Sequence, residues 1–214
     1  MQGDLEIVDH VPQAFAVLVA SEAPQSIALS GGDTARRCYE LLATADVAWR
    51  DCDVFFGDER WVAVHDPDSN EGMARVTFLD QVEPHAVHSM HAAGPTPEAA
   101  ADAYDQLISS APPLALVHLG LGEDGHTASL FPGSSALDER DRLVIATGDD
   151  KHSHRRLTFT YPAIARASLV VFTVSGEGKR AALDRVRRGE DVPAARVHAD
   201  RIIWLVDKAA AGSA

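Results

Sequence analysis

Short apolar runs alternate along this chain with segments of helical periodicity, and this alternation limits the fold more than any other feature. Short aliphatic or aromatic runs are typical of strands that are buried on both faces of a sheet. When such strands alternate with helices, the sheet that they build is largely parallel. Strands are expected at residues 27–29, 53–56, 114–117, 143–147, 156–160, 169–174 and 202–206.

Helices are expected between most of these strands, at residues 10–21, after 34, from 69, at about 98–108 and after 179. No repeat or low-complexity linker divides the chain. We therefore predict one α/β domain over residues 1–207 with a largely parallel sheet. Residues 208–214 are rich in alanine and glycine and are expected to form a frayed tail.

The formal net charge of the 214 residues is -13. Because nucleic-acid binding depends on clustered Lys and Arg, we expect no nucleic-acid partner. A small anionic substrate is compatible with this charge, since screening over roughly 8 Å lets a few local cations decide what a pocket binds. No apolar run is long enough to span a membrane, and the N-terminus lacks the features of a secretory signal. Cys38 and Cys52 fit a reducing compartment. We expect a cytoplasmic monomer or small homo-oligomer without a membrane partner.

A glycine-rich stretch, residues 119–133, follows the predicted strand at 114–117. Its glycines permit sharp bends and let a ligand approach the main chain closely. Asp124 and His126 would therefore lie at the carboxyl end of a strand, where open α/β sheets bind their ligands. We predict that the chemistry of this protein takes place here.

The same stretch has the spacing of a dinucleotide-binding turn at Gly120, Gly122 and Gly125. That turn needs a full helix after its last glycine, and Pro132 would break such a helix within about two turns. The Glu-Asp pair between the glycines also places negative charge where a pyrophosphate would lie. We therefore do not expect a dinucleotide ligand.

Residues 30–34 form a second glycine turn between a predicted strand and a predicted helix. Such a turn directs free backbone N–H groups and the positive end of the helix toward an anion. An ordinary turn, with Asp33 or Thr34 as the helix N-cap, explains the sequence equally well. Lys179 follows another glycine turn, where it is either an exposed lysine or an added charge for a bound anion.

Three charged residues, Asp58, Glu59 and Arg60, follow the predicted strand at 53–56. A solvated turn is the usual explanation of such a triplet. A ligand site gains weight only because the predicted strand at 27–29 also ends in a loop that is suited to ligands.

Three histidines, His85, His88 and His91, recur at intervals of three residues, which is a spacing that suggests a metal site. Prolines on both sides of the segment prevent a continuous helix from presenting all three rings on one face. We predict a surface loop here and no metal.

Taken in order, four groups of loop residues resemble those of the 6-phosphogluconolactonase family. The resemblance extends over residues 26–206, and its most specific part is Gly-Glu-Asp-Gly-His-Thr-Ala-Ser-Leu-Phe-Pro at 122–132. It implies a three-layer α/β/α, Rossmann-like fold. It also implies hydrolysis of 6-phospho-D-glucono-1,5-lactone to 6-phosphogluconate in the oxidative pentose phosphate pathway, without a cofactor. The four groups are 30–34, 57–60 with 69–70, 120–133, and 156–160 with 178–179.

Two other functions are alternatives. The related glucosamine-6-phosphate deaminases carry Asn-Glu-Pro after the histidine loop, whereas this chain has Leu130, Phe131 and Pro132 there and so lacks the titratable group. A non-catalytic sugar-phosphate-binding protein is the other alternative, and the presence of both Asp124 and His126 argues against it.

The chain departs from the family pattern at three positions. Many members carry Ser where this chain has Asp33, so an anion replaces one hydroxyl contact while the backbone amides remain. Many also carry Pro where this chain has Ala35 and Ala63, a loss that affects loop stiffness more than chemistry.

These residues lead to one mechanistic hypothesis. Neutral His126 takes a proton from the water that attacks the lactone carbonyl, a task suited to an imidazole with an ordinary pKa of about 6.5. Asp124 orients the ring or the water, and Arg60 meets the phosphate or the carbonyl oxygen. The candidate binding residues, which would hold the phosphate, are Ser30, Gly31, Gly32, Asp33, Thr34, Arg156 and Lys179.

Overall fold

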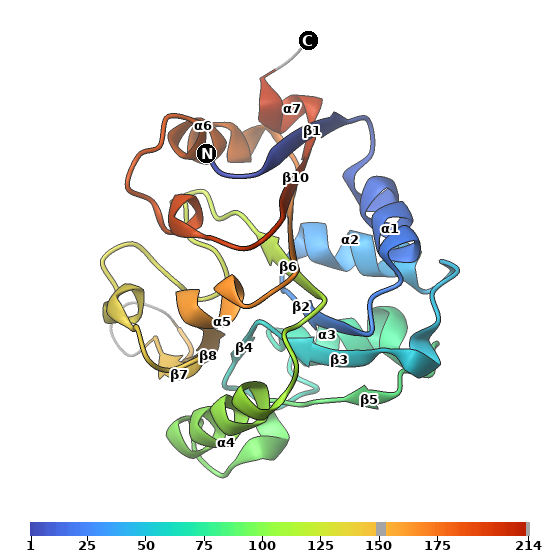
Figure 1. Ribbon diagram of the computed structural model, residues 1–214, viewed down its shortest axis with the longest axis vertical. Coiled ribbons are helices and arrows are strands. Elements are labelled where there is room, and N and C mark those ends of the chain that lie inside the picture. Colours follow the sequence, from blue (N-terminus) through green and yellow to red (C-terminus); the bar gives the residue numbers. More distant parts are fainter. Residues whose placement is uncertain (149–152, 213–214) are drawn as a thin grey trace.

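The computed structural model describes residues 1–148 and 153–212 of the chain (Figure 1). Its main sheet is parallel throughout and has the strand order β1-β10-β9-β6-β2-β3-β5. The predicted α/β domain with a largely parallel sheet is thus confirmed. The strands are β1 (Asp4–Val8), β2 (Ser26–Leu29), β3 (Asp53–Phe56), β5 (Ala86–Val87), β6 (Leu116–Gly120), β9 (Leu169–Val174) and β10 (Ile202–Asp207).

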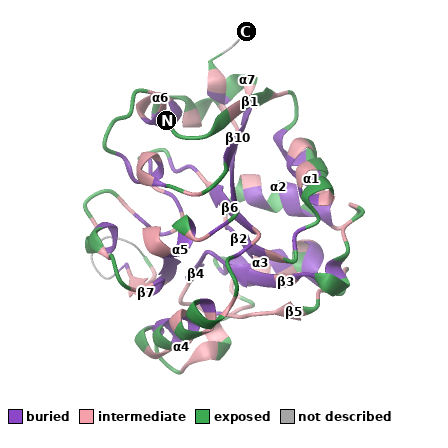
Figure 2. Cartoon of the chain, in the orientation of Figure 1, coloured by how far each residue is buried: buried purple, intermediate pink, exposed green. Residues whose placement is uncertain are grey.

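Helices cover both faces of this sheet, which gives the three layers that the family resemblance implies. One side carries α1 (Val11–Glu22), α2 (Asp33–Leu42) and α3 (Asn70–Ala74), and the other carries α4 (Pro97–Ser110), α5 (Tyr161–Ala165) and α6 (Arg180–Arg187) (Figure 1). Buried residues follow the central strands and the inner faces of the helices (Figure 2). Short helical turns complete the chain: η1 (Trp49–Asp51), η2 (Arg75–Leu79), η3 (His91–Ala93), η4 (Ser135–Asp138), η5 (Glu177–Lys179) and η6 (Pro193–Arg196).

The central strand β6 begins two residues later than the apolar run at 114–117 predicts, and it continues through His118 to Gly120. Periodicity does not place a histidine in a strand buried on both faces. Here both ring nitrogens of His118 have partners, Tyr39 and Thr173, so the ring is buried without an unsatisfied polar atom. The backbone N–H of Ala115 donates to the side chain of Ser26 rather than to a strand ladder.

A second, antiparallel sheet lies beside the first, with the strand order β4-β8-β7. Its strands are β4 (Asp58–Arg60), β7 (Val144–Thr147) and β8 (Arg156–Phe159). The predicted strands at 143–147 and 156–160 therefore form, but outside the parallel sheet. The charged triplet 58–60 is a strand rather than a turn, because it pairs with β8. The edge strands β1 and β5 are only partly buried, so the sequence has no continuous apolar run that would predict them.

The end of the chain differs from the frayed tail expected from residue 208. Residues Lys208–Ala211 form α7, whose N-cap Asp207 accepts a hydrogen bond from the Ala210 backbone N–H at 2.7 Å. Ala210 is buried, and this contact orders the helix. Residues 213–214 lie outside the described part. None of the helices that the structure describes combines the length and the apolar character needed to cross a bilayer.

Candidate active site

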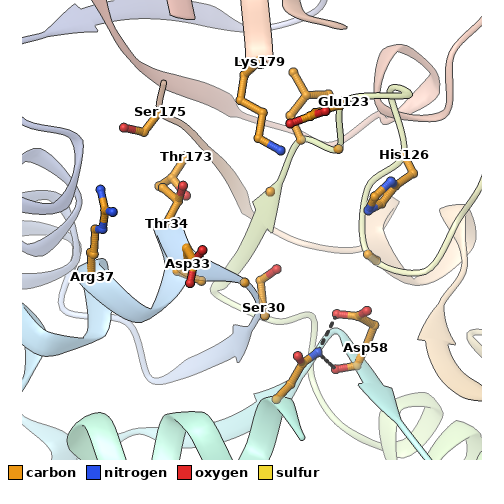
Figure 3. Close-up of a pocket in the computed structure, with 18 of the residues that line it drawn as sticks. Ser30, Asp33, Thr34, Arg37, Asp58, Glu123, His126, Thr173, Ser175 and Lys179 are labelled. Atoms are coloured by element: carbon orange, nitrogen blue, oxygen red, sulfur yellow. Dashed lines mark hydrogen bonds between the residues drawn. The ribbon is translucent and has the colours of Figure 1, made fainter. Parts of the chain in front are cut away.

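The carboxyl ends of β2, β6 and β9 lie side by side, because these strands are neighbours in a parallel sheet. The direction of strand addition reverses between β2 and β6: the chain continues from β2 to β3 on one side and from β6 to β9 on the other. Ligands of open α/β sheets bind at such a reversal. A cleft of about 510 Å³ lies at this point (Figure 3).

Nine of the ten predicted site residues line this cleft, so the structure brings together loops that are far apart in the sequence. The tenth, Asp124, contacts the ring of His126 from behind. The nine are Ser30, Gly31, Gly32, Asp33, Thr34, Arg60, His126, Arg156 and Lys179. The prediction did not include the six further lining residues that have polar or charged side chains, which are Arg37, Asp58, Asn70, Glu123, Thr173 and Ser175.

Asp124 holds the imidazole of His126. Oδ1 of Asp124 lies 2.6 Å from Nδ1 of His126 and also accepts the His126 backbone N–H at 3.0 Å. Partial burial alone would raise the pKa of Asp124, but these hydrogen bonds and the nearby imidazole outweigh burial, and the pKa is lowered. An ionised Asp124 assigns the ring proton to Nδ1 and leaves Nε2 with a free lone pair. The ring, which also packs on Phe131, points into the cleft with a basic nitrogen available (Figure 3).

The stretch that carries this pair is built from turns. The Gly122 backbone N–H donates to the His126 carbonyl at 2.9 Å, which closes the loop around Asp124. Residues 121–134, all of which the structure describes, contain no helix. The helix N-terminus that a dinucleotide pyrophosphate needs is therefore missing here.

The turn between β2 and α2 leaves backbone donors free. Gly32 is the N-cap of α2 with φ of 94°, and none of the side chains that the structure describes caps the helix. Neither Asp33 nor Thr34 fills the capping role that an ordinary turn would give it. The side chain of Asp33 is 82% exposed and pairs with Arg36 at 3.0 Å. The first-turn N–H groups of α2 therefore lack a side-chain acceptor among the described residues, an arrangement that is suited to an anion.

Arg60 and Arg156 lie opposite each other in the register of β4 and β8. Like charges in this position destabilise an antiparallel pair. Nε of both guanidinium groups is buried and has no hydrogen-bond partner among the described residues. Burial lowers the pKa of Arg156. The charge of Asp58 acts against this lowering, and the charge of Arg60 adds to it. Two adjacent cations with unused donors are suited to an anion that binds between them.

Two more cations reach the cleft from its other walls. Lys179 ends η5 and extends into the cleft, and Arg37 projects from α2 (Figure 3). The sequence signal for Arg37 is its spacing of three residues from Thr34, which places both on one face of the helix. The turn before Lys179 is held by Asp207, whose Oδ2 accepts the Ser175 hydroxyl at 2.5 Å and the next backbone N–H at 2.9 Å.

The charge of the cleft contrasts with that of the whole chain. Within residues 1–148 and 153–212, four cations line it, Arg37, Arg60, Arg156 and Lys179, against three carboxylates, Asp33, Asp58 and Glu123. Although the chain carries a formal charge of -13, these cations lie beside the free backbone N–H groups of the cleft. An anionic ligand is attracted to this cleft in particular.

Behind Arg60, a buried carboxylate organises the loop. Glu59 accepts the Ser69 hydroxyl and the backbone N–H groups of Arg60, Asn70 and Glu71 at 2.6 to 3.0 Å. These bonds tie β4 to the start of α3, so they set the positions of Arg60 and Asn70 at the cleft. In the sequence, Asp58, Glu59 and Arg60 form one charged triplet, which does not separate the buried Glu59 from its two neighbours at the cleft.

Asp58 and Asn70 form the floor of the cleft. The side-chain amide of Asn70 donates to the Asp58 carbonyl at 2.9 Å and to its carboxylate at 3.2 Å (Figure 3). The Ser129 hydroxyl donates to the other carboxylate oxygen at 2.7 Å. Because its acceptors are engaged, the Asp58 carboxylate is held in place beside the arginines.

Among the described residues, Glu59, Glu71 and His91 are close enough to hold a metal. Their oxygens are already engaged, in Glu59 by the bonds above and in Glu71 by Arg75 and Ser89. A metal would have to displace these donors, so the group fits a hydrogen-bond centre better than a metal site.

The surface loop that was expected for His85, His88 and His91 is wrong for His91. Its side chain is only 14% exposed, and its Nε2 lies 3.4 Å from a carboxylate oxygen of Glu59.

A family model described as glucosamine-6-phosphate isomerases/6-phosphogluconolactonase matches residues 5–204. A 6-phosphogluconolactonase of Synechocystis is 42% identical over 207 residues, which cover 90% of this chain and 85% of that protein. One of Mycobacterium tuberculosis is 38% identical over 218 residues, which cover 92% of this chain and 88% of that protein.

Solved structures are similar over almost the whole chain. The 6-phosphogluconolactonase of Thermotoga maritima has a TM-score of 0.84 at 26% identity and covers 97% of this chain and 100% of that one. A monomeric glucosamine-6-phosphate deaminase also has a TM-score of 0.84, at 20% identity over 98% of this chain and 99% of that one, which shows the shared fold alone. From the family match and the identities of 42% and 38%, the chain belongs to the glucosamine-6-phosphate isomerase/6-phosphogluconolactonase family.

Proposed function

We propose that this chain hydrolyses 6-phospho-D-glucono-1,5-lactone to 6-phospho-D-gluconate, with His126 as the general base. The reaction is the second step of the oxidative pentose phosphate pathway, and the relatives at 42% and 38% identity are 6-phosphogluconolactonases. One observation carries the assignment of His126: its ring, bonded to Asp124, faces the same cleft as the anion turn and the cations.

The substrate phosphate binds at the turn between β2 and α2. The first-turn N–H groups of α2 donate to its oxygens, and Lys179 and Arg37 neutralise its charge from either side. This placement leaves the lactone ring to extend toward His126, across the cleft (Figure 3). Arg60 and Arg156 then lie near the ring and its carbonyl rather than at the helix end.

The proton moves through Nε2 of His126. As the oxygen of a water molecule bonds to the lactone carbonyl carbon, Nε2 accepts one of its protons, and Asp124 stabilises the imidazolium that forms. Arg60 or Arg156 stabilises the negative charge on the carbonyl oxygen. The bond between this carbon and the ring oxygen then breaks, and the imidazolium returns the proton to that ring oxygen. The carboxylic acid product ionises in water.

Phe131 favours hydrolysis over deamination. In the glucosamine-6-phosphate deaminases, a glutamate follows the histidine loop. In this chain Phe131 takes that place, and its ring centroid lies 4.5 Å from that of His126. The guanidinium of Arg156 lies 5.3 Å from the Phe131 centroid. An apolar ring positions its neighbours but cannot transfer protons to an amino sugar.

The proposal also includes a cytoplasmic location and a monomer or small homo-oligomer with no nucleic-acid partner. Both cysteines, Cys38 and Cys52, are free and buried, which fits a reducing compartment.

The test uses lactone that glucose-6-phosphate dehydrogenase generates in situ from glucose 6-phosphate. Remaining lactone is measured with hydroxylamine against a buffer blank, because the lactone also opens spontaneously. The wild-type chain should remove the lactone and release protons. His126→Ala should lower kcat by about 10² to 10⁴ while KM changes little. His65→Ala, at an exposed histidine, is the control.

Two outcomes would contradict the proposal. Ammonia release from glucosamine 6-phosphate, with no lactone loss above the blank, would indicate a deaminase. Binding of 6-phosphogluconate without turnover of the lactone would indicate a sugar-phosphate-binding protein. An unchanged kcat in His126→Ala would remove His126 from the mechanism but leave the activity.

A further inference from the structure

A chain of buried hydrogen bonds joins two walls of the cleft from below. His118 on β6 is fully buried, with Nδ1 2.8 Å from the Tyr39 hydroxyl and Nε2 2.8 Å from the Thr173 hydroxyl. The Tyr39 oxygen accepts the Ser30 backbone N–H at 2.7 Å and lies 3.1 Å from the Ser30 carbonyl. Ser30 and Thr173 both line the cleft (Figure 3).

The imidazole in this chain carries a single N–H. Burial lowers the pKa of His118 to about 3, so the ring is neutral near neutral pH. One proton cannot serve both Tyr39 and Thr173. The ring therefore donates to one of these hydroxyls and accepts from the other.

The two tautomers present different groups to the cleft. If Nδ1 carries the proton, it donates to Tyr39, Tyr39 donates to the Ser30 carbonyl, and Thr173 must turn its own proton toward Nε2. If Nε2 carries the proton, it donates to Thr173, and Tyr39 donates to Nδ1. The Thr173 proton is then free to turn toward the cleft. The number of protons is the same in both arrangements.

A bound phosphate distinguishes between these arrangements. Phosphate oxygens accept hydrogen bonds and are repelled by the lone pairs that Thr173 presents in the first arrangement. The Cys38 side chain also hydrogen-bonds Thr173, and burial raises the pKa of that thiol to about 12, so it keeps its proton. A neutral thiol is a weak acceptor, which leaves the phosphate as the better partner for the hydroxyl proton of Thr173.

We propose that His118, Tyr39 and Thr173 are positioning residues for the phosphate: the bound complex holds His118 with its proton on Nε2, so that Thr173 donates its hydroxyl to the anion. Tyr39 accepts the Ser30 N–H and so fixes the opposite wall. The inference rests on the proposed function, because it takes the anion to be the phosphate of the lactone. Its effect is on substrate binding, since only Thr173 touches the substrate and none of the three exchanges a proton with it.

The kinetic test compares 6-phosphogluconolactone with D-glucono-1,5-lactone, which lacks the phosphate. In Thr173→Val, the ratio of kcat/KM for the two lactones should fall about tenfold, mostly through KM, because one hydrogen bond to a charged group is lost. Thr173→Ser keeps the hydroxyl and should restore the ratio. An equal loss on both lactones, or no rescue by serine, would overturn the proposal.

The matched control removes a buried threonine hydroxyl elsewhere. Thr160 is fully buried and donates to the Arg142 carbonyl at 2.6 Å, outside the lining of the cleft. Thr160→Val should lower the melting temperature without changing the ratio of the two lactones. A ratio that falls equally in Thr160→Val would mean that loss of stability alone explains the effect.

A spectroscopic test reads the tautomer directly, without turnover. Nitrogen NMR of the labelled full chain, recorded with saturating inorganic phosphate, should show His118 with a protonated Nε2 and an unprotonated Nδ1. A protonated Nδ1 in the phosphate complex would refute the inference. This readout separates the two proposals, because a chain that binds phosphate with the expected tautomer but does not hydrolyse the lactone contradicts the proposed function alone.

Discussion

The imidazole of His126 is held on three sides, by Asp124, by Phe131 and by the backbone of Gly122. A Cβ at residue 122 would lie 2.0 Å from Nδ1 of His126, far inside any contact distance. The ring therefore occupies its position only because residue 122 has no side chain.

Gly122→Ala tests this close approach. The added methyl should displace the imidazole and lower kcat by about 100-fold, the loss that a shift of roughly 1 Å causes, while KM changes little. Gly57→Ala is the matched control, because the nearest atom to its Cβ would be 3.4 Å away. A kcat close to that of the wild type in Gly122→Ala would mean that the ring position does not depend on this contact.

Asp124→Asn tests the charge behind the ring. The amide keeps the size of the side chain but cannot stabilise an imidazolium by charge, so we expect kcat to fall about 10- to 100-fold. Because the pKa of Asp124 is lowered, its carboxylate should stay ionised at every pH above about 4. A kcat equal to that of the wild type would contradict this role.

Among the elements, β4 has a composition that no strand propensity favours, yet it carries two residues that line the cleft, Asp58 and Arg60. Its pairing with β8 places Arg60 opposite Arg156, and the buried Glu59 between the flanking residues ties the strand to α3. The buried carboxylate accepts the backbone N–H groups of Arg60, Asn70 and Glu71, which stabilises the element. Two like charges next to each other break a pairing rule, which is typical of functional sites.

Glu59→Gln tests this arrangement. An amide nitrogen would face the donors of Ser69 and Glu71 or those of Arg60 and Asn70, so at least one buried backbone N–H loses its acceptor. The free energy of unfolding should fall by roughly 2 to 3 kcal/mol. Urea denaturation measures the change.

The control for this prediction is Glu83→Gln. Glu83 makes an exposed ion pair with Arg50, and its loss should change stability by no more than about 0.5 kcal/mol. Equal stability losses in the two variants would show that Glu59 is an ordinary surface carboxylate in energetic terms.

On the scale of the whole molecule, His118 couples the stability of the fold to pH. Unfolded chains protonate histidine near pH 6.5, whereas burial lowers the pKa of His118 in the folded chain to about 3. Between these values only the unfolded chain binds the proton. The contribution of this group to stability should therefore fall by about 1.4 kcal/mol for each pH unit below about 6.5.

Urea denaturation at several pH values between about 4 and 7 checks this expectation. His118→Gln should show a shallower loss of stability toward acid than the wild-type chain. His65→Gln, which alters an exposed ring, should leave the slope as it is. If the slopes of the wild type and His118→Gln were the same, His118 would not be the group that titrates on unfolding.

How much could be predicted from the sequence depended on burial. Strands β3 and β9 are found at their predicted residues because they are enclosed on both faces and read as continuous apolar runs. Strands β1 and β5 lie at the edges of the sheet and have no such pattern. Strand β4 is decided by its pairing with β8, which no local rule contains. The predicted end of β6 at residue 117 was also too early, because the partners that allow His118 to be buried in the strand come from other elements.

By itself, the amino-acid sequence determined the fold class and nine of the residues that line the cleft, because glycine turns, helix starts and apolar runs are local signals. Only the tertiary structure decided which loops meet, and therefore that Arg37 joins the cleft and that Arg60 lies opposite Arg156. It also decided that His118 links Tyr39 to Thr173. The physical reason is that strand order and register bring together residues far apart in the chain, and hydrogen bonds form between whichever groups then lie within reach.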